Sequence, residues 1–172
     1  MFKIIILVAI VLICSLIGYV YGESFKERYL ELSELMRNLI DMENEIVYSY
    51  RPLPVVLEKV GRKSEGVVAD IFLNTASLLE NGEMDDIKTA FLISLDNQKE
   101  KIAMTKEDFD IILDLSKSLG DTDVLGQEHI FALAKEKLSK RVNIAEKEYS
   151  DSCKMYKYLG ISVGLMIAIF LI

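Results

Sequence analysis

The sequence predicts an all-α protein: an antiparallel bundle of about six helices, flanked by an N-terminal and a C-terminal transmembrane helix. Three observations predict this class. Apolar residues between positions 23 and 157 recur at the helical spacing of three and four, and the alternation typical of strands is absent. Both ends of the chain are uncharged apolar runs. The two prolines among the 172 residues stand close together, at Pro52 and Pro54, which leaves room for long helices.

The N-terminal run, residues 4–21, is long enough to cross a bilayer. Its 18 residues correspond to about 27 Å of helix, close to a hydrocarbon core of about 30 Å. Tyr19 and Tyr21 are typical of residues that anchor a helix at the membrane surface. A cleaved signal peptide is the alternative, because Lys3 opens the run and small residues near Gly22 offer a cleavage point. We expect residues 1–22 to be retained as a transmembrane helix.

The C-terminal run, residues 158–172, continues an amphipathic helix that starts near Asp123. The apolar side of that helix is expected to face the bundle through Phe131, Ala134, Leu138, Val142, Ala145 and Tyr149. The last 15 residues carry no charge, so the helix should enter the bilayer. This span is only about 22 Å long, and either Lys157 reaching the membrane surface or local thinning of the bilayer can cover the mismatch. The predicted domains are thus residues 1–22 and 158–172 in the membrane and a helical-bundle domain over residues 23–157.

Breaks in the bundle domain mark its helices. The first is predicted over residues 23–50, before the two prolines, and Pro54 suits the first turn of a short helix ending near Val60. Asn81-Gly82 closes a third helix, and Asp85 or Asp86 caps a fourth. The faces expected in the core on the first, third, fourth and fifth helices include Leu32, Leu35, Leu39, Met42, Ile46, Val68, Ile71, Phe72, Thr75, Leu78, Leu79, Ile87, Phe91, Ser94, Leu95, Phe109, Ile112, Leu113, Ser116 and Leu119.

The fifth and sixth helices have start signals of their own. Thr105 with Asp108 resembles a capping box, with Asp in the place of the usual Glu. Gly120 should stop the fifth helix, and Asp121-Thr122-Asp123 should start the last one.

Basic residues beside the two spans predict the orientation. Lys26, Arg28 and Arg37 follow the first span, five more basic residues lie between positions 140 and 157, and Lys3 is the one base outside. The positive-inside rule therefore places the bundle domain in the cytoplasm. Small residues also recur every four positions in both spans, at Cys14, Gly18, Gly22, Gly160, Gly164 and Ala168. Such stripes let helices pack closely, although glycine and alanine are also common in membrane helices without that role.

The composition argues against several functions. The chain has 27 acidic and 20 basic residues, so nucleic acid is not an expected partner. Cys14 and Cys153 form no CxxC pair, and His129, the one histidine, lies on the polar side of its helix. The stretch Gly61-Arg62-Lys63-Ser64 departs from a phosphate loop, because Arg62 separates the glycine from the lysine and no strand precedes it. We expect no catalytic residues, no metal and no cofactor.

One acidic residue stands where an apolar residue is expected. By helical phase, Glu43 falls near the middle of the apolar arc of the helix over residues 23–50. Gln127 raises the same question, because it continues the apolar stripe of the last helix one turn upstream. The two side chains can satisfy each other or backbone groups, or Glu43 can reach solvent or a lysine. Glu34, Asp41 and Glu45 form a separate acidic strip, which is expected to be solvated.

Three motifs together resemble the stage III sporulation protein AB family: LIDMENEIVY at residues 39–48 with Pro52-Leu53, LGDTD at residues 119–123 with Gln127, and KMYKYLG at residues 154–160. The resemblance spans nearly the whole chain, and Thr122, where a serine is expected, is a mild departure. The resemblance places Glu43, Glu45, Asp123 and Gln127 in matching motifs, as candidates for partner binding or a polar core.

The resemblance implies a membrane protein of endospore-forming bacteria, with a cytoplasmic domain similar to the F proteins of type II secretion systems. It would be a non-enzymatic platform in the mother-cell membrane that faces the forespore, in the channel between the two cells. The implied partners are other stage III proteins, including a cytoplasmic ATPase, with membrane lipid and, as an open option, further copies of the chain. A sensor with an external ligand-binding bundle is the alternative, although such a sensor should continue into an output domain beyond Ile172.

Overall fold

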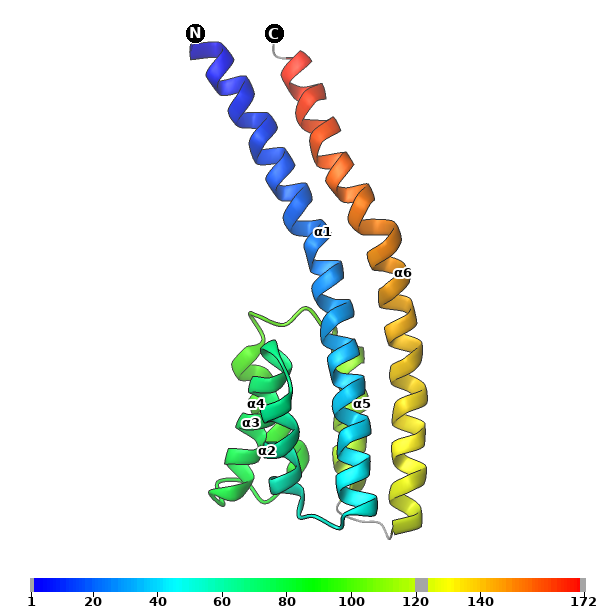
Figure 1. Ribbon diagram of the computed structural model, residues 1–172. Helices are drawn as coiled ribbons and strands as arrows, with labels where there is room; N and C mark the ends of the chain where they lie inside the picture. The colour runs from blue at the N-terminus through cyan, green and yellow to red at the C-terminus, as the bar shows by residue number, and fades with distance from the viewer. Residues whose placement is uncertain (1, 120–123, 171–172) are drawn as a thin grey trace. The chain divides into compact units, whose positions relative to one another are not determined.

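A computed structural model describes residues 2–119 and 124–170 of the chain (Figure 1). Its elements are α1 (Phe2–Glu43), the π-helix η1 (Asn44–Tyr48), α2 (Leu53–Lys63), α3 (Gly66–Glu80), α4 (Ile87–Gln98), α5 (Lys106–Leu119) and α6 (Val124–Phe170). Every regular element in this described part is helical, so the predicted all-α class is confirmed. The break predicted at residues 120–123 lies outside the described residues.

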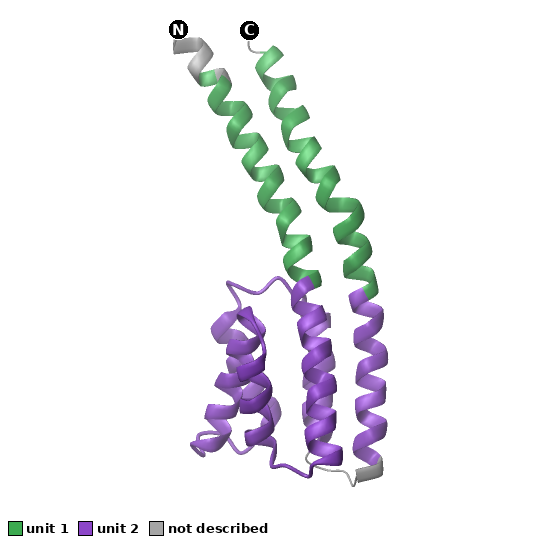
Figure 2. Ribbon diagram, in the orientation of Figure 1, with its two compact units in different colours: residues 1–29, 143–172 green, residues 30–142 purple. Residues whose placement is uncertain are grey.

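The chain folds into two compact units (Figure 2). Unit 1 consists of residues 1–29 and 143–172, the outer parts of α1 and α6, which run side by side. Unit 2 consists of residues 30–142 and holds the remaining parts of α1 and α6 together with α2 to α5. The two units are defined by which residues pack together, not by the membrane. The predicted membrane boundaries at residues 22 and 158 therefore stay a prediction.

The first predicted helix proves longer than expected at its start and different at its end. α1 continues without interruption through Gly22, because a single glycine costs only about 1 kcal/mol in a helix that tertiary packing supports. At the other end, α1 gives way at Glu43 to η1, a wider turn of helix. The chain then turns sharply at Tyr50, whose φ of 51° is unusual for a residue with a side chain.

The core of unit 2 is built from one face of each helix. Leu32, Leu35, Leu39 and Met42 of α1 are buried as predicted, as are Phe131, Ala134 and Leu138 of α6. Phe72 of α3 and Phe91 of α4 meet edge to face, with ring centroids 5.7 Å apart. Burial of each large apolar side chain contributes about 1.5–3 kcal/mol, which makes this core the main source of stability. Thr75 and Ser94, both predicted on core faces, are buried and share a hydrogen bond of 2.9 Å between their hydroxyl oxygens.

Several predicted helix ends are confirmed. Gly82 adopts a φ of +66° after the last turn of α3, and the N–H of Glu83 donates to the carbonyl of Leu78 over 3.1 Å. Asp86 accepts a 2.9 Å hydrogen bond from the N–H of Thr89 and so caps α4. The short second helix extends past Val60 to Lys63, so Gly61 is buried inside a helix.

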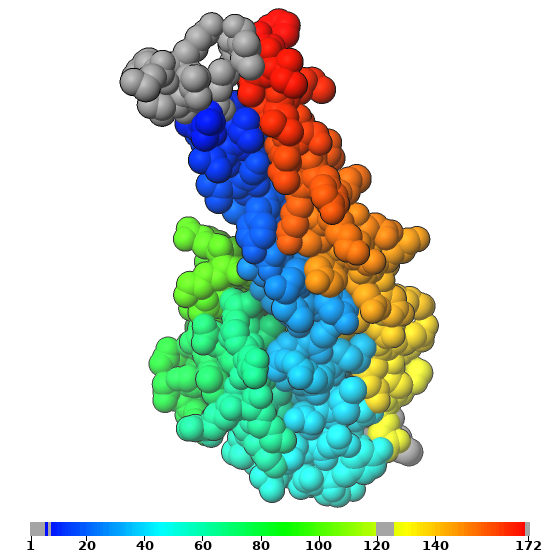
Figure 3. All heavy atoms as spheres, turned by 45° about the horizontal axis from the view of Figure 1, so that its top comes forward, coloured from blue at the N-terminus to red at the C-terminus, as the bar shows by residue number. Residues whose placement is uncertain are grey.

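Both terminal helices contain a stretch that is long and apolar enough, by length and composition alone, to cross a membrane. The space-filling view shows the two helices of unit 1 side by side (Figure 3).

Candidate functional site

Glu43 ends α1 and forms an ion pair with Lys135 of α6. The Glu43 side chain is 13% exposed and that of Lys135 is 33% exposed, so the pair is partly shielded from water. The structure therefore selects the lysine among the partners that helical phase left open. Lys135 can pair with Glu43 because α6 passes beside the end of α1 in unit 2, and the long lysine side chain reaches the carboxylate.

Glu45, in η1, connects three segments of unit 2. Its carboxylate lies 3.0 Å from Nε of Arg51, in the connection to α2, and 2.5 Å from Nζ of Lys59 on α2. The hydrogen bond from Lys59 is the largest of the effects that hold the pKa of Glu45 below its ordinary value. Glu45 thus fixes η1 to α2 rather than standing in solvent.

The other two candidates in this group are Gln127 and Asp123. Gln127 is half-buried on α6, about two turns before Lys135. Asp123 lies outside the described residues.

The prediction of a solvated acidic strip is wrong for Glu34. Its side chain is buried, with the whole residue only 8% exposed, and Oε1 accepts a 3.3 Å hydrogen bond from the N–H of Glu65 at the start of α3. Arg37 pairs with the same carboxylate. Helical phase placed Glu34 off the apolar arc but could not show that the segment between α2 and α3 covers it.

A buried ion pair that the sequence prediction missed joins α5 to α6. Asp108 is 0% exposed, and its Oδ1 lies 2.5 Å from Nε of Arg141. Its Oδ2 accepts a 2.9 Å hydrogen bond from the N–H of Thr105, which is half of the predicted capping box. Thr105 Oγ1 instead accepts from Arg141 over 3.0 Å. The signal in the sequence was Arg141 itself, a charged residue three positions after Leu138 and four before Ala145 on an otherwise apolar stripe.

The small residues of the two spans meet within unit 1. A Cβ added at Gly18 would lie 2.6 Å from the carbonyl oxygen of Tyr156 and 2.9 Å from Cα of Gly160. A Cβ at Gly160 would lie 2.7 Å from the carbonyl oxygen of Cys14. Gly22 and Gly164 also face the opposite helix closely, whereas Ala168 is half-buried. At Gly18 and Gly160 the backbones approach so closely that no other residue fits without moving a helix.

Aromatic and charged residues gather where the apolar runs end. Phe25 and Tyr156 stack with ring centroids 5.6 Å apart, and Tyr21 lies 5.2 Å from Tyr156. Glu23 pairs with Lys26 over 2.6 Å and with Lys157 over 3.6 Å. Such a belt is typical of a helix pair at a membrane surface.

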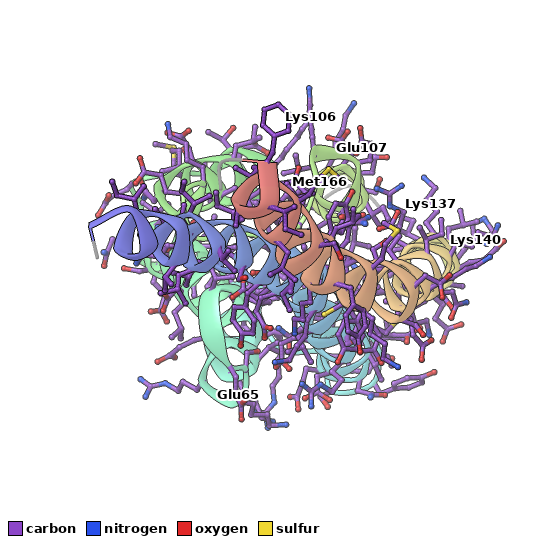
Figure 4. All side chains as sticks on the ribbon, turned by 90° about the horizontal axis from the view of Figure 1, so that it is seen from above. Glu65, Lys106, Glu107, Lys137, Lys140 and Met166 are labelled. Carbon is purple, nitrogen blue, oxygen red and sulfur yellow. The ribbon has the colours of Figure 1, made fainter. Side chains whose placement is uncertain are left out.

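Within the described ranges, no group of three His, Cys, Asp or Glu side chains lies close enough together to hold a metal ion. His129 is exposed, in agreement with its predicted position on the polar side of α6. Lys137 and Lys140 of α6 and Glu65, the residue before α3, point outward (Figure 4). The arrangement as a whole holds helices together.

Comparison with known proteins gives a consistent result. Residues 3–172 match the family model of stage III sporulation protein AB. Stage III sporulation protein AB of Bacillus subtilis (strain 168) is 26% identical over 171 residues, which cover 99% of this chain and 99% of that protein. A solved structure of a stage III sporulation protein AB superposes with a TM-score of 0.65 over 72% of this chain and 96% of that chain, at 24% identity. The structural likeness shows a shared fold.

Proposed function

The chain belongs to the stage III sporulation protein AB family, which implies a role in sporulation, and from this premise we propose that it is a non-enzymatic, two-pass membrane platform. By its family resemblance, the platform is part of the channel between mother cell and forespore. Its partners are other stage III proteins, including a cytoplasmic ATPase. Unit 2 lies in the cytoplasm of the mother cell, as the basic residues beside both spans favour.

One observation carries the membrane assignment. In the most apolar 18-residue windows of the two terminal helices, only 11% and 17% of the residues are buried inside the structure. The core helix of a soluble protein is apolar because it is covered by its own chain, and these windows are not covered. Their outward apolar side chains, including Leu16, Met166 and Ile169, match the hydrocarbon of a bilayer.

Cysteine accessibility tests the orientation. In a variant with Cys14 and Cys153 replaced by serine, a single cysteine at the exposed position of Ser77 in α3 would be treated with a membrane-impermeant thiol reagent. We expect labelling only after the cells are opened. Labelling of intact cells would overturn the cytoplasmic placement and favour the external sensor.

We place the partner-binding surface of unit 2 at η1. Tyr48, the last residue of η1, and Tyr50, two residues beyond it, are 66% and 74% exposed, and tyrosine is enriched among residues that dominate binding energy. π-Helices occur frequently at functional sites. Glu43 and Glu45 hold this segment through Lys135 and Lys59, so their part is to position the surface.

Co-purification of the other stage III proteins from membranes of sporulating cells tests this placement. Replacing Tyr48 and Tyr50 together with alanine should reduce recovery of the ATPase while the thermal melt stays unchanged. Leu92→Ala, at another exposed apolar residue of unit 2, is the matched control. Full recovery with the double variant would exclude η1 as the binding surface.

A further inference from the structure

An apolar groove lies between α1 and α6 of unit 1, with a lysine among its lining residues. The groove has a volume of about 400 Å³ and is lined by Leu12, Ser15, Leu16, Tyr19, Lys157 and Ile161. Apart from Ser15, which is half-buried, and Lys157, the lining side chains are exposed and apolar. In a bilayer these side chains face lipid, so the groove is an open channel along the helix pair at the depth of the acyl chains.

The charges beside the groove do not balance. Glu23 contacts two ammonium groups, Lys26 at 2.6 Å and Lys157 at 3.6 Å. The hydrogen bond from Lys26 is the largest effect on Glu23, whose pKa lies below its ordinary value, so the carboxylate is ionised at neutral pH. One negative and two positive charges leave these three groups with a surplus of one positive charge.

Lys157 places this surplus positive charge at the expected membrane surface. Lys157 is the last charged residue of the sequence, immediately before the apolar run at residues 158–172. Its Nζ lies 4.7 Å from the centroid of the Tyr19 ring, which also lines the groove. The ammonium group is therefore held at the groove, at the level where lipid headgroups are found.

We propose that this groove binds one anionic phospholipid, with its phosphate at Lys157 and Lys26 and an acyl chain along the apolar lining. The inference rests on the membrane spans of the proposed function and adds a defined lipid site to them. Another protein helix is a poorer occupant, because it would cover Lys157 without providing a counter-charge, at a high cost in desolvation. A phosphate supplies that counter-charge, and an acyl chain fills a narrow apolar groove.

A second groove of unit 1 differs from the first in charge. It is lined by Cys14, Ile17, Gly18, Tyr21, Tyr156, Leu159, Gly160 and Val163 and has about the same volume, 410 Å³. None of its lining residues is charged. Phosphate recognition is thus expected on the Lys157 side of the helix pair alone.

Native mass spectrometry of the full chain in mild detergent, titrated with phosphatidylglycerol, tests the proposal. We expect one phosphatidylglycerol to bind the wild-type protein. Lys157→Gln should weaken binding about fivefold, the equivalent of about 1 kcal/mol for one basic residue at a membrane surface. Lys157→Arg should retain binding, because it keeps the charge. Lys154→Gln, at an exposed lysine of the same helix that does not line the groove, should change binding by less than about twofold.

Three results would overturn the lipid site. The first is equal binding by the wild type and Lys157→Gln, and the second is an equal loss with Lys154→Gln. The third is competition by inorganic phosphate at the same concentration, because a site for the headgroup alone needs no groove. Carbonate extraction separates this proposal from the membrane platform: release of the wild-type protein would refute the spans, whereas a protein that stays in the membrane without binding lipid refutes only the lipid site.

Discussion

At the scale of single residues, the charged side chains of unit 2 fix helices to one another. Glu43 pairs with Lys135, Glu45 with Lys59 and Arg51, and Asp108 with Arg141. These pairs differ in burial, and burial decides how much each one matters. An exposed pair contributes about 0–1 kcal/mol, while loss of one partner from a buried pair costs about 3–5 kcal/mol.

The Glu43 pair lies between these limits. Glu43→Ala should lower the free energy of unfolding of the full chain by about 1–2 kcal/mol, because the partly buried Lys135 loses its partner. Thermal melts in detergent measure this, and the double variant with Lys135→Ala should lose less than the sum of the single variants. Lys140→Ala, which breaks an exposed pair with Glu136, is the control. A Glu43→Ala protein with unchanged melting and normal ATPase recovery would refute both a structural and a positioning role.

Asp108 should be the most sensitive acidic residue of unit 2. Asp108→Ala removes the partner of Arg141 and the acceptor for the N–H of Thr105, so we expect a loss of about 3 kcal/mol or more in the free energy of unfolding. Asp108→Asn should lose less, because the amide oxygen can still accept from Thr105. Asp110→Ala, on the exposed side of α5, should be nearly neutral. Equal melting of Asp108→Ala and Asp110→Ala would contradict the buried pair.

The lowered pKa of Glu45 predicts how the stability of the protein depends on pH. Its pKa in the folded protein is below the ordinary 4.5, chiefly because Lys59 donates a hydrogen bond to the carboxylate. A lowered pKa means that Glu45 adds stability above about pH 4.5 and that this contribution is lost as the pH falls through the folded-state value. Glu45→Gln should therefore flatten the fall in melting temperature between about pH 5 and pH 3. Glu65→Gln, whose side chain points outward (Figure 4), should keep the wild-type slope, and an unchanged slope in Glu45→Gln would contradict the assignment.

At the scale of elements, the helix pair of unit 1 depends on close backbone contact. A Cβ at Gly18 would meet the backbone of Tyr156 and Gly160 at less than 3 Å, and backbone cannot move aside as a flexible side chain can. In lipid, the hydrophobic effect does not drive helices together, so such packing supplies much of the attraction. An ion pair between Arg28 and Glu148 at 2.5 Å and the stacked rings of Tyr29 and Tyr149 also join the two helices.

Gly18→Leu should separate the two helices of unit 1. Overpacking costs about 1–3 kcal/mol in ordinary cores, and a clash with backbone belongs at the upper end of that range. Disulfide formation between engineered cysteines at Tyr21 and Tyr156, in a background without Cys14 and Cys153, reports whether the helices still meet. Ala9→Leu adds the same side chain on an exposed face of α1 and should leave cross-linking intact. Equal cross-linking in both variants would mean that the glycines do not set the spacing.

At the scale of the whole molecule, the proposed membrane platform requires both apolar ends of the chain. Unit 1 is built from both ends of the chain, so removal of the first 22 residues would leave the apolar end of α6 without the part of α1 that packs against it at Gly18 and Gly160. We therefore expect the mature protein to retain its N-terminus.

N-terminal sequencing, or intact-mass measurement, of the protein extracted from membranes checks this expectation. The mass should correspond to all 172 residues, apart from processing of Met1. A mature start near Glu23 would show that the first run is a signal peptide and would remove the helix pair on which the platform depends.

The sequence alone determined the local features of this protein. Helical periodicity predicted the all-α class, and specific residues predicted where helices begin or end: Gly82 after α3, Asp85 or Asp86 before α4, and Thr105 with Asp108 before α5. Apolar length predicted the two candidate spans, and the motifs predicted the family. These signals are local because a helix depends on residues three and four positions apart, and a cap on its nearest neighbours.

Only the tertiary structure decided which side chains meet across the chain. Helical phase placed Glu43 on an apolar arc without identifying Lys135, and it placed Glu34 in solvent although the start of α3 covers it. The capping-box motif predicted Asp108 as part of a helix cap and did not identify it as the partner of Arg141. The physical reason is common to all three: the phase of one helix shows which way a side chain leaves the backbone, while its burial and partner depend on what another element, tens of residues away, brings to that place.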